Sequence, residues 1–334
     1  MNTTNPVNPA KQVWRRLSTV PELSSILPMV ILFIGVSCVN SYFVNPRNLG
    51  YIAKMMSIWG MMAIGECFIM MVGEIDISIS SMCCWCGMFF AWLLVQLQLH
   101  WSIAILLTIG MSVLCSLANA VLIISARLPA FVVSIGMSFV YKGLARYITQ
   151  SQPIKIKSVP WGKEFAEFGT SRIFGTGWSF PILMLVFIIF WYVLHRTTYG
   201  RKVTATGDSL MAARISGVDT DRIKFSVFAI SGLMVGLTAC LMVGRETTAN
   251  PANCAGWEMN CIAACAIGGA SMSGGAGSII GLFFGVVFMA GVLNAINLLS
   301  INSNWQNIIV GFSIMISVTM DVLRRQKKLG VSAR

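Results

Sequence analysis

The chain has 334 residues, of which 56% are hydrophobic and only 11% are charged, and its mean hydropathy is +0.76. Soluble domains carry about 25% charged residues, so this composition excludes an ordinary soluble protein and predicts an all-α, polytopic membrane protein. The net charge of +12 would favour a nucleic-acid partner in a soluble chain, but here the basic residues gather in short segments between apolar runs, which is typical of a topology signal. We expect no nucleic-acid partner.

Ten apolar segments follow one another along the chain. A membrane-spanning helix needs roughly 20 apolar residues, and the eighth segment is short enough to be broken or re-entrant. The expected segments are 23–43, 51–72, 79–97, 101–124, 130–149, 178–195, 224–243, 257–272, 277–297 and 305–323.

Basic residues set the expected orientation. They gather in 1–22, in the loop 196–223 and in the tail 324–334, and Lys and Arg favour the cytoplasmic side. Ten crossings then put both termini in the cytoplasm, with 1–22 as a cytoplasmic tail that is not a cleaved signal, 23–323 as the transmembrane domain and 324–334 as a basic cytoplasmic tail. The loop 150–177 is expected outside, where it either meets a soluble partner or is a plain connection.

The internal loop contains the stretch ATGDSLMAARISGVDTDRIKF, residues 205–225. Asp208 or Ser209 can cap a helix start, and Gly217 is a natural helix stop. Because Ala212 and Ala213 give this short helix a smooth face, it can dock on a cytoplasmic partner. A lipid-facing amphipathic connector is the alternative.

Glycines crowd the stretch GGASMSGGAGSIIGLFFG, residues 268–285. A phosphate-binding P-loop would need a Gly-Lys pair followed by Ser or Thr, and no Lys or Arg lies between Arg245 and Arg324. Gly277, Gly281 and Gly285 recur every four residues, so we expect them to form a face that lets helices approach closely.

No enzyme signature is present: the only histidines are His100 and His195, and neither a zinc-protease motif nor a nucleophile elbow occurs. The ten cysteines lack zinc spacing, and we expect them to be buried, inert thiols. Polar residues inside or beside the spans indicate a permeation path better than a catalytic site. The candidates for this path are Glu66, Glu74, Asp76, Asn119, Glu258, Asn294 and Asn297.

Four ordered motifs together resemble the permease subunits of ribose-type sugar ABC importers, within the branched-chain amino acid and sugar permease group. They are GEIDISIS (73–80), LANAVLIISARLPAFVVSIG (117–136), TTYGRKVTATGDSLMAARISGV (197–218) and GWEMNCIAACAIGGASMSGGAGSIIG (256–281). The resemblance covers about residues 50–325. The chain departs from the family pattern at Ser80, at Ala120 and at Asp208–Ser209.

The resemblance implies a division of labour in a bacterial inner membrane. Two permease chains, identical or paralogous, form the path for a monosaccharide such as a ribose-like pentose, a hexose or a related furanose. A cytoplasmic tandem ATPase binds ATP and magnesium, so this chain would hold no cofactor, and a periplasmic binding protein delivers the sugar. The coupling helix would be 205–217, with Gly207, Asp208, Ala212, Ala213, Arg214 and Gly217. The alternative function is a proton-coupled secondary transporter of a small polar solute.

Three carboxylates lie in or beside an apolar run in the stretch IGECFIMMVGEIDISIS, residues 64–80. We expect Glu74 and Asp76 to accept backbone N–H groups at the start of the third segment, where the helix dipole favours negative charge. Direct contact with sugar is the alternative for these two residues. Glu66, inside the apolar run, should be either protonated or paired with Lys142.

Overall fold

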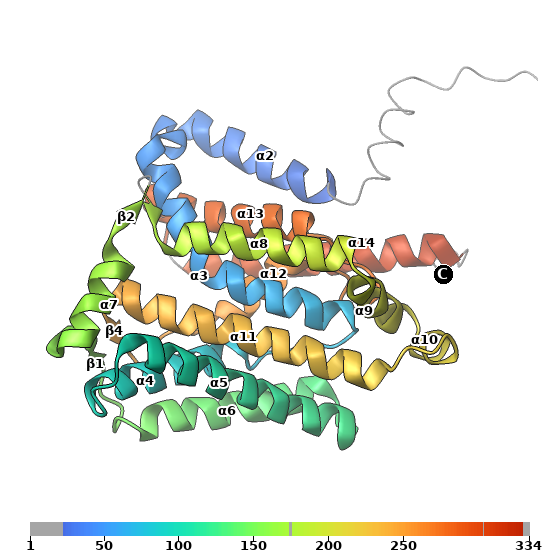
Figure 1. The fold of residues 1–334 in the computed structure, drawn as a ribbon. Coiled ribbons are helices and arrows are strands. Elements are labelled where there is room, and N and C mark those ends of the chain that lie inside the picture. The colour runs from blue at the N-terminus through green and yellow to red at the C-terminus, as the bar shows by residue number, and fades with distance from the viewer. Residues whose placement is uncertain (1–22, 174–175, 303, 330–334) are drawn as a thin grey trace, which may run out of the picture.

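A computed structural model describes residues 23–173, 176–302 and 304–329 of the chain. Helices dominate it (Figure 1). The long helices are α2 (Leu23–Val39), α3 (Pro46–Met71), α4 (Ile79–Val95), α5 (Trp101–Ala120), α6 (Ala130–Tyr147), α8 (Ser179–Arg196), α11 (Thr220–Glu246), α12 (Trp257–Ile267), α13 (Ile279–Leu298) and α14 (Asn304–Leu329).

Short elements connect these helices. A 3-10 turn η1 (Ser41–Val44) follows α2, a π-helical stretch η2 (Val121–Ser125) extends α5, and a second 3-10 turn is η3 (Ile156–Ser158). The connecting helices are α7 (Pro160–Thr170), α9 (Thr198–Asp208) and α10 (Leu210–Ile215). Two antiparallel pairs of very short strands join β1 (Ile154–Lys155) to β4 (Thr248–Ala249) and β2 (Arg172–Ile173) to β3 (Thr176–Gly177).

Each expected apolar segment corresponds to one helix, although the eighth, 257–272, contains only the 11-residue α12. Within the described part of the chain, five helices are long and apolar enough to cross a membrane, namely Pro46–Met71, Trp101–Ser125, Ser179–Arg196, Thr220–Glu246 and Ile279–Leu298. Shorter apolar helices cover Ser25–Val39, Ile79–Val95 and Trp257–Ile267. The all-α, multi-pass architecture therefore agrees with the prediction, whereas ten crossings stay a prediction.

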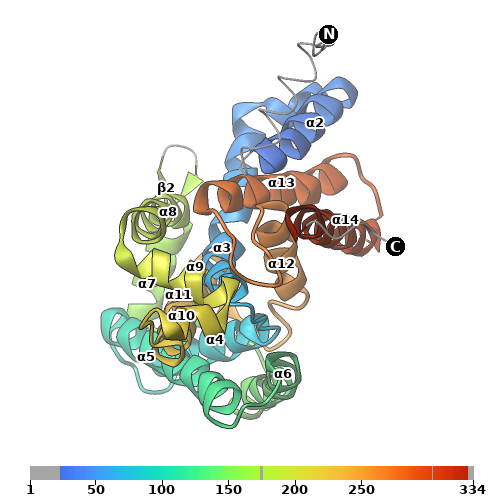
Figure 2. The same ribbon diagram turned by 90° about the vertical axis from the view of Figure 1, so that its right-hand side faces the viewer.

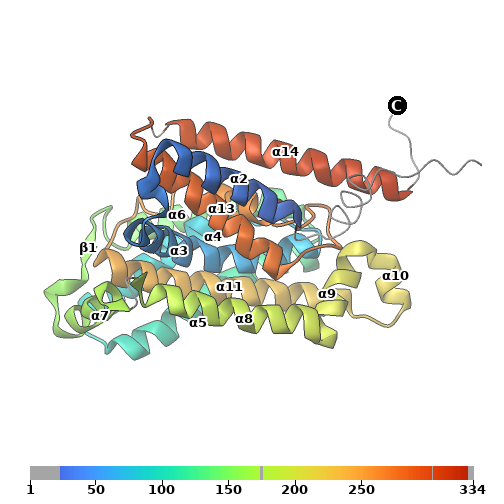
Figure 3. The same ribbon diagram turned by 90° about the horizontal axis from the view of Figure 1, so that it is seen from above.

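The two ends of the bundle differ. In Figure 1 the start of α2, the end of α14 and helices α9 and α10 lie at one end, and α7 with β1 and β4 lies at the other. Seen along the bundle (Figure 2), α6, α4, α12 and α14 follow one another around one side. Viewed from above (Figure 3), α10 projects beyond the ends of α8 and α11.

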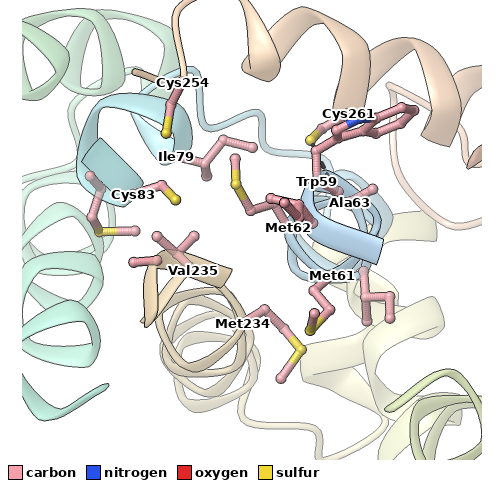
Figure 4. Close-up of a cluster of buried hydrophobic side chains, with 14 of the residues drawn as sticks. Trp59, Met61, Met62, Ala63, Ile79, Cys83, Met234, Val235, Cys254 and Cys261 are labelled. Carbon is pink, nitrogen blue, oxygen red and sulfur yellow. Dashed lines mark hydrogen bonds between the residues drawn. The ribbon is translucent and has the colours of Figure 1, made fainter. Parts of the chain in front are cut away.

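Helices α3 and α11 form the centre of the bundle. In the most apolar 18-residue stretch of α3, 89% of the residues are buried, whereas in the corresponding stretch of α8, at the periphery, 28% are buried. Figure 4 shows Met62 of α3 and Ile79 and Cys83 of α4 near Met234 and Val235 of α11, all buried. A helix that is apolar on all sides is expected in such a central position.

The cysteines largely follow their prediction. Eight of the ten thiols are buried, Cys115 is half-buried and Cys38 is exposed.

Candidate functional site

The turn between α3 and α4 carries a buried polar network. Asp76 Oδ1 accepts hydrogen bonds from Ser78 N at 2.8 Å and from Ser78 Oγ at 2.6 Å. Asn119 Nδ2 on α5 donates to Ser78 Oγ at 2.8 Å and to Asp76 Oδ2 at 3.3 Å. Tyr141 Oη on α6 lies 2.9 Å from both Asn119 Oδ1 and the carbonyl oxygen of Cys115, two acceptors for its single proton. These side chains, which we call the turn network, join α5 and α6 to the start of α4.

The local sequence explains this turn. Gly73 has a φ of +81°, a left-handed conformation that glycine adopts without steric cost, and the chain reverses there at the end of α3. Asp76 then accepts the backbone N–H of Ser78, one residue before α4 begins. Asp76, which is fully buried inside the bundle, therefore holds the turn that leads into α4 through Ser78, the residue before the helix, and the predicted cap on the helix's own N–H groups stays a prediction.

Glu74 lies elsewhere and does not cap α4. Its carboxylate forms a salt bridge with Lys224 near the start of α11, and both side chains are largely buried. The expectation that Glu74 and Asp76 act together at the start of α4 is therefore wrong for Glu74. The side chains of Glu74 and Asp76 leave the turn toward different partners, since Glu74 reaches α11 and Asp76 reaches α5.

Glu66 lies on α3 and is fully buried beside the turn network. Its Oε1 accepts from the backbone N–H of Asp76 at 3.2 Å, while Oε2 has no hydrogen-bond partner among the described residues. Lys142, its predicted partner, is exposed on α6, with its Nζ 5.8 Å from the ring centre of Phe139. The pairing with Lys142 is therefore wrong. An anion would leave one carboxylate oxygen uncompensated, so the geometry fits the other alternative, a protonated Glu66.

Two side-chain hydrogen bonds tie α4 to its neighbours beyond the turn. Ser80 Oγ donates to Glu258 Oε2 of α12 at 2.6 Å. Ser81 Oγ and Ser138 Oγ of α6 lie 2.8 Å apart. The first half of α4 is thus a polar seam between α6 and α12, and Glu258 belongs to this seam.

The last two predicted path residues lie away from this region. Asn294 on α13 exchanges two side-chain hydrogen bonds, at 2.8 and 3.0 Å, with Asn48 at the start of α3. Asn297 is exposed one turn later. The structure therefore brings Glu66, Asp76 and Asn119 together, places Glu258 on the adjacent seam, and leaves Glu74, Asn294 and Asn297 in separate places.

Sequence reasoning missed Tyr141 and Asn48. Tyr141 recurs at helical spacing with Ser134, Ser138 and Ala145, all of which are buried, and this period could have identified the inward face of α6.

The cytoplasmic loop contains the expected short helix. Ser209 caps α10 by accepting from Ala212 N at 3.3 Å, and Gly217 ends it with a φ of +79°. Asp208 is instead the last residue of α9. Arg214 donates to Thr220 and forms an exposed ion pair with Asp221, which ties α10 to the start of α11.

The exposed face of α10 differs from the prediction. Ala213 is buried within the chain and cannot meet a partner, while Ala212 is exposed. Met211 and Ile215, with 71% and 80% of their surface exposed, form the apolar outer face. The smooth alanine face is therefore wrong for Ala213, because α10 turns that residue toward its own chain.

Gly207, near the end of α9, has a packing role. A Cβ on Gly207 would meet the carbonyl oxygen of Met71 and, at 2.5 Å, the backbone nitrogen of Gly275. Helix α9, which contains Gly207, is also held against α11 by Tyr199, whose hydroxyl lies 2.8 Å from Ser226 Oγ. Burial raises the pKa of this tyrosine, although the hydrogen bond acts in the opposite direction.

Helix α13 packs closely on the end of α12 through glycines. A Cβ on Gly281 would overlap the carbonyl oxygen of Gly268, and one on Gly285 would overlap that of Ala264. Gly277 precedes α13 and lies against the Met71 side chain instead. The predicted packing face is thus present at Gly281 and Gly285, and Gly277 belongs to a different contact.

Comparison with known proteins gives one family. The profile described as "Branched-chain amino acid transport system / permease component" matches residues 48–318. No solved structure matches the chain.

Curated relatives cover nearly the whole chain. The ribose import permease protein RbsC of Bacillus subtilis (strain 168) is 30% identical over 300 residues, which are 90% of this chain and 92% of that protein. The L-arabinose ABC transporter permease protein AraH of Azospirillum brasilense is 27% identical, with 91% and 88% covered. The autoinducer 2 import system permease protein LsrC of Photorhabdus luminescens is also 27% identical, with 90% and 89% covered. These matches confirm the resemblance read from the four motifs, and the chain belongs to the branched-chain amino acid transport system / permease component family.

Proposed function

We propose that this chain is the membrane-spanning permease subunit of an ABC importer for a monosaccharide. Relatives named as ribose, L-arabinose and autoinducer 2 permeases, aligned over about nine tenths of the chain, support this function. A bundle with buried polar groups on several helices also fits a transport path, since polar residues in membrane helices usually face a bundle interior or a water-filled route.

The proposed topology has ten crossings in a bacterial inner membrane, with both termini in the cytoplasm. The start of α2, the end of α14 and helices α9 and α10 lie at one end of the bundle (Figure 1), which supports placing them all on the side favoured by basic residues.

The proposed partners follow from the family. A second permease chain completes the path, a periplasmic binding protein delivers the sugar, and a separate cytoplasmic ATPase holds ATP and magnesium. Helix α10 is the proposed contact with the ATPase. Its exposed Met211 and Ile215 support this role, because exposed apolar side chains on a projecting helix are typical of an interaction surface.

The experiment is reconstitution in proteoliposomes with a tandem ATPase and a sugar-binding protein from the same organism. We expect import of D-ribose or L-arabinose that needs ATP and survives an uncoupler. Import that an uncoupler abolishes while ATP is maintained would favour the proton-coupled transporter instead. The buried carboxyl of Glu66, with one unpartnered oxygen, is the observation that would then suggest the proton carrier.

Helix α10 can be tested in the same vesicles. Ile215→Asp should leave folding intact, because the side chain is 80% exposed, but it should weaken association with the ATPase and lower import. Lys163→Asp, an exposed position on α7 at the opposite end of the bundle, is the matched control. Full ATPase binding by Ile215→Asp would show that α10 is only a connector.

A further inference from the structure

A hollow of about 510 Å³ lies where the chain leaves α6 and folds over the end of α4. It is lined by the last turn of α4 and by residues 148–158. Its volume falls within the range of roughly 300–1,000 Å³ found for small-molecule sites. In the proposed topology this hollow opens on the external side.

The wall of this hollow is held in a fixed shape. Gln150 and Ser151 both have positive φ, 51° and 64°, and strained positions of this kind persist only where the surroundings hold them. Ser151 N donates to Arg146 O at 2.8 Å, and Ile154 pairs with Ala249 in the β1–β4 ladder. The hollow is therefore built into the fold by contacts at both ends of the segment.

The lining combines one aromatic ring with groups that form hydrogen bonds. Trp92 comes from α4 and Gln96 directly follows that helix, and Thr149, Gln152 and Lys155 come from the folded-over segment. Thr149 Oγ1 is shielded from solvent and has no hydrogen-bond partner in the described chain. Leaving a buried hydroxyl unpaired is unfavourable, so a ligand that supplies a hydrogen-bond partner gains from this group.

These groups suit a monosaccharide. A sugar presents C–H groups on its ring faces and hydroxyls around its edge, so the indole of Trp92 can cover a face while the amides of Gln96 and Gln152 bind hydroxyls as donor or acceptor. By contrast, the hollow of about 290 Å³ between α8 and α13 is lined only by apolar side chains, including Trp191 and Phe283. That second hollow has no means of recognising hydroxyls.

An aromatic row connects this hollow with the polar seam of α4. The rings of Trp92 and Phe89 are stacked with centres 6.3 Å apart, and those of Phe89 and Trp85 lie 5.8 Å apart. A neighbouring hollow of about 640 Å³ is lined by Trp85 and Tyr147, among others. One helical turn before Trp85 lies Ser81, part of the seam. The row thus extends along α4 from the hollow to the seam.

We propose that the hollow at Trp92, Thr149 and Gln152 is an outer subsite that receives a monosaccharide from the binding protein before the sugar moves along α4. This inference rests on the proposed function.

The test uses the complete transporter in proteoliposomes with its ATPase and sugar-loaded binding protein. Trp92→Ala, Gln152→Leu and the milder Thr149→Val are compared for import of whichever of D-ribose and L-arabinose the wild type imports, and for stimulated ATP hydrolysis. Trp161→Ala, which removes another partly exposed aromatic at the same end, is the control. We expect Trp92→Ala and Gln152→Leu to lower sugar imported per ATP at least about fivefold, with stimulated hydrolysis unchanged and the control normal.

The opposing outcomes are distinct. An equal fall in hydrolysis and import would show that the hollow is a docking surface for the binding protein, which overturns the subsite. Unchanged import in all three variants would also overturn it and leave the proposed function standing. A wild-type transporter that imports neither sugar under ATP would remove the proposed function and, with it, this inference.

Discussion

The contact between α12 and α13 allows a prediction in which one methyl group decides stability. In Gly281→Ala the new Cβ would overlap the backbone carbonyl of Gly268 and lie 3.4 Å from Ser25 Oγ. A backbone group cannot rotate away as a side chain can, so the helices must move apart. Overpacking costs roughly 1–3 kcal/mol, and Ala favours a helix over Gly by about 1 kcal/mol. Taking the overpacking cost at its upper end, about 3 kcal/mol, and subtracting the gain in helix propensity, we expect the free energy of unfolding to fall by about 2 kcal/mol.

The matched control is Gly110→Ala on α5, where an added Cβ would meet nothing within 4 Å. This control should be neutral or more stable by up to about 1 kcal/mol, because only the helix propensity changes. Unfolding of both variants would be measured in mixed micelles with increasing SDS. If Gly281→Ala is as stable as Gly110→Ala, the close approach of α12 and α13 is not as described.

Three further predictions concern buried groups. Glu66→Gln should change the free energy of unfolding by less than about 1 kcal/mol, since the amide oxygen still accepts from the backbone N–H of Asp76. A loss of about 3 kcal/mol or more in the same SDS titration would show that the anion is required. Asn119→Leu should lower the free energy of unfolding by about 2 kcal/mol, because it removes the donor to Asp76 and an acceptor of Tyr141. Tyr141→Phe should then cost less in the Asn119→Leu background than in the wild type. Strictly additive losses would contradict the network. Cys254 should resist a membrane-impermeant maleimide until the protein is denatured, because it is 3% exposed and burial raises the pKa of its thiol, whereas Ala255→Cys in the same loop should be labelled at once.

The helices could be predicted well because their signal is local. Each apolar run became a helix, and the differences arise at the ends. The first segment stops at Val39 because Asn40 caps a 3-10 turn, and α3 begins five residues early because Asn45 caps it with Pro46 at its first position. That Asn-Pro pair is a helix-start signal in the sequence. Helix α7 was not predicted, since it is a short connection outside the apolar runs.

Contacts between helices could not be predicted in the same way, because they depend on how each helix is rotated. Lys142 follows Tyr141 by one residue, which turns its side chain about 100° around the helix. Tyr141 therefore faces the core and Lys142 is exposed. An apolar run that contains few polar residues gives little indication of which face of its helix points to the core. The same uncertainty explains why Ala213, rather than Met211, was expected on the outer face of α10.

The arrangement of glycines suggests how a movement of α10 would reach the turn network. The end of α9 meets the end of α3 at Gly207, where a side chain would overlap the carbonyl oxygen of Met71. That same carbonyl accepts a hydrogen bond from Gly275 N at 2.9 Å. Backbone groups therefore touch directly, with no flexible side chain between them to absorb a displacement. Gly73 follows Met71 by two residues and begins the turn that carries Asp76. A force on α10 would thus act on the turn through a few rigid contacts, which is the mechanical property that coupling to an ATPase would require.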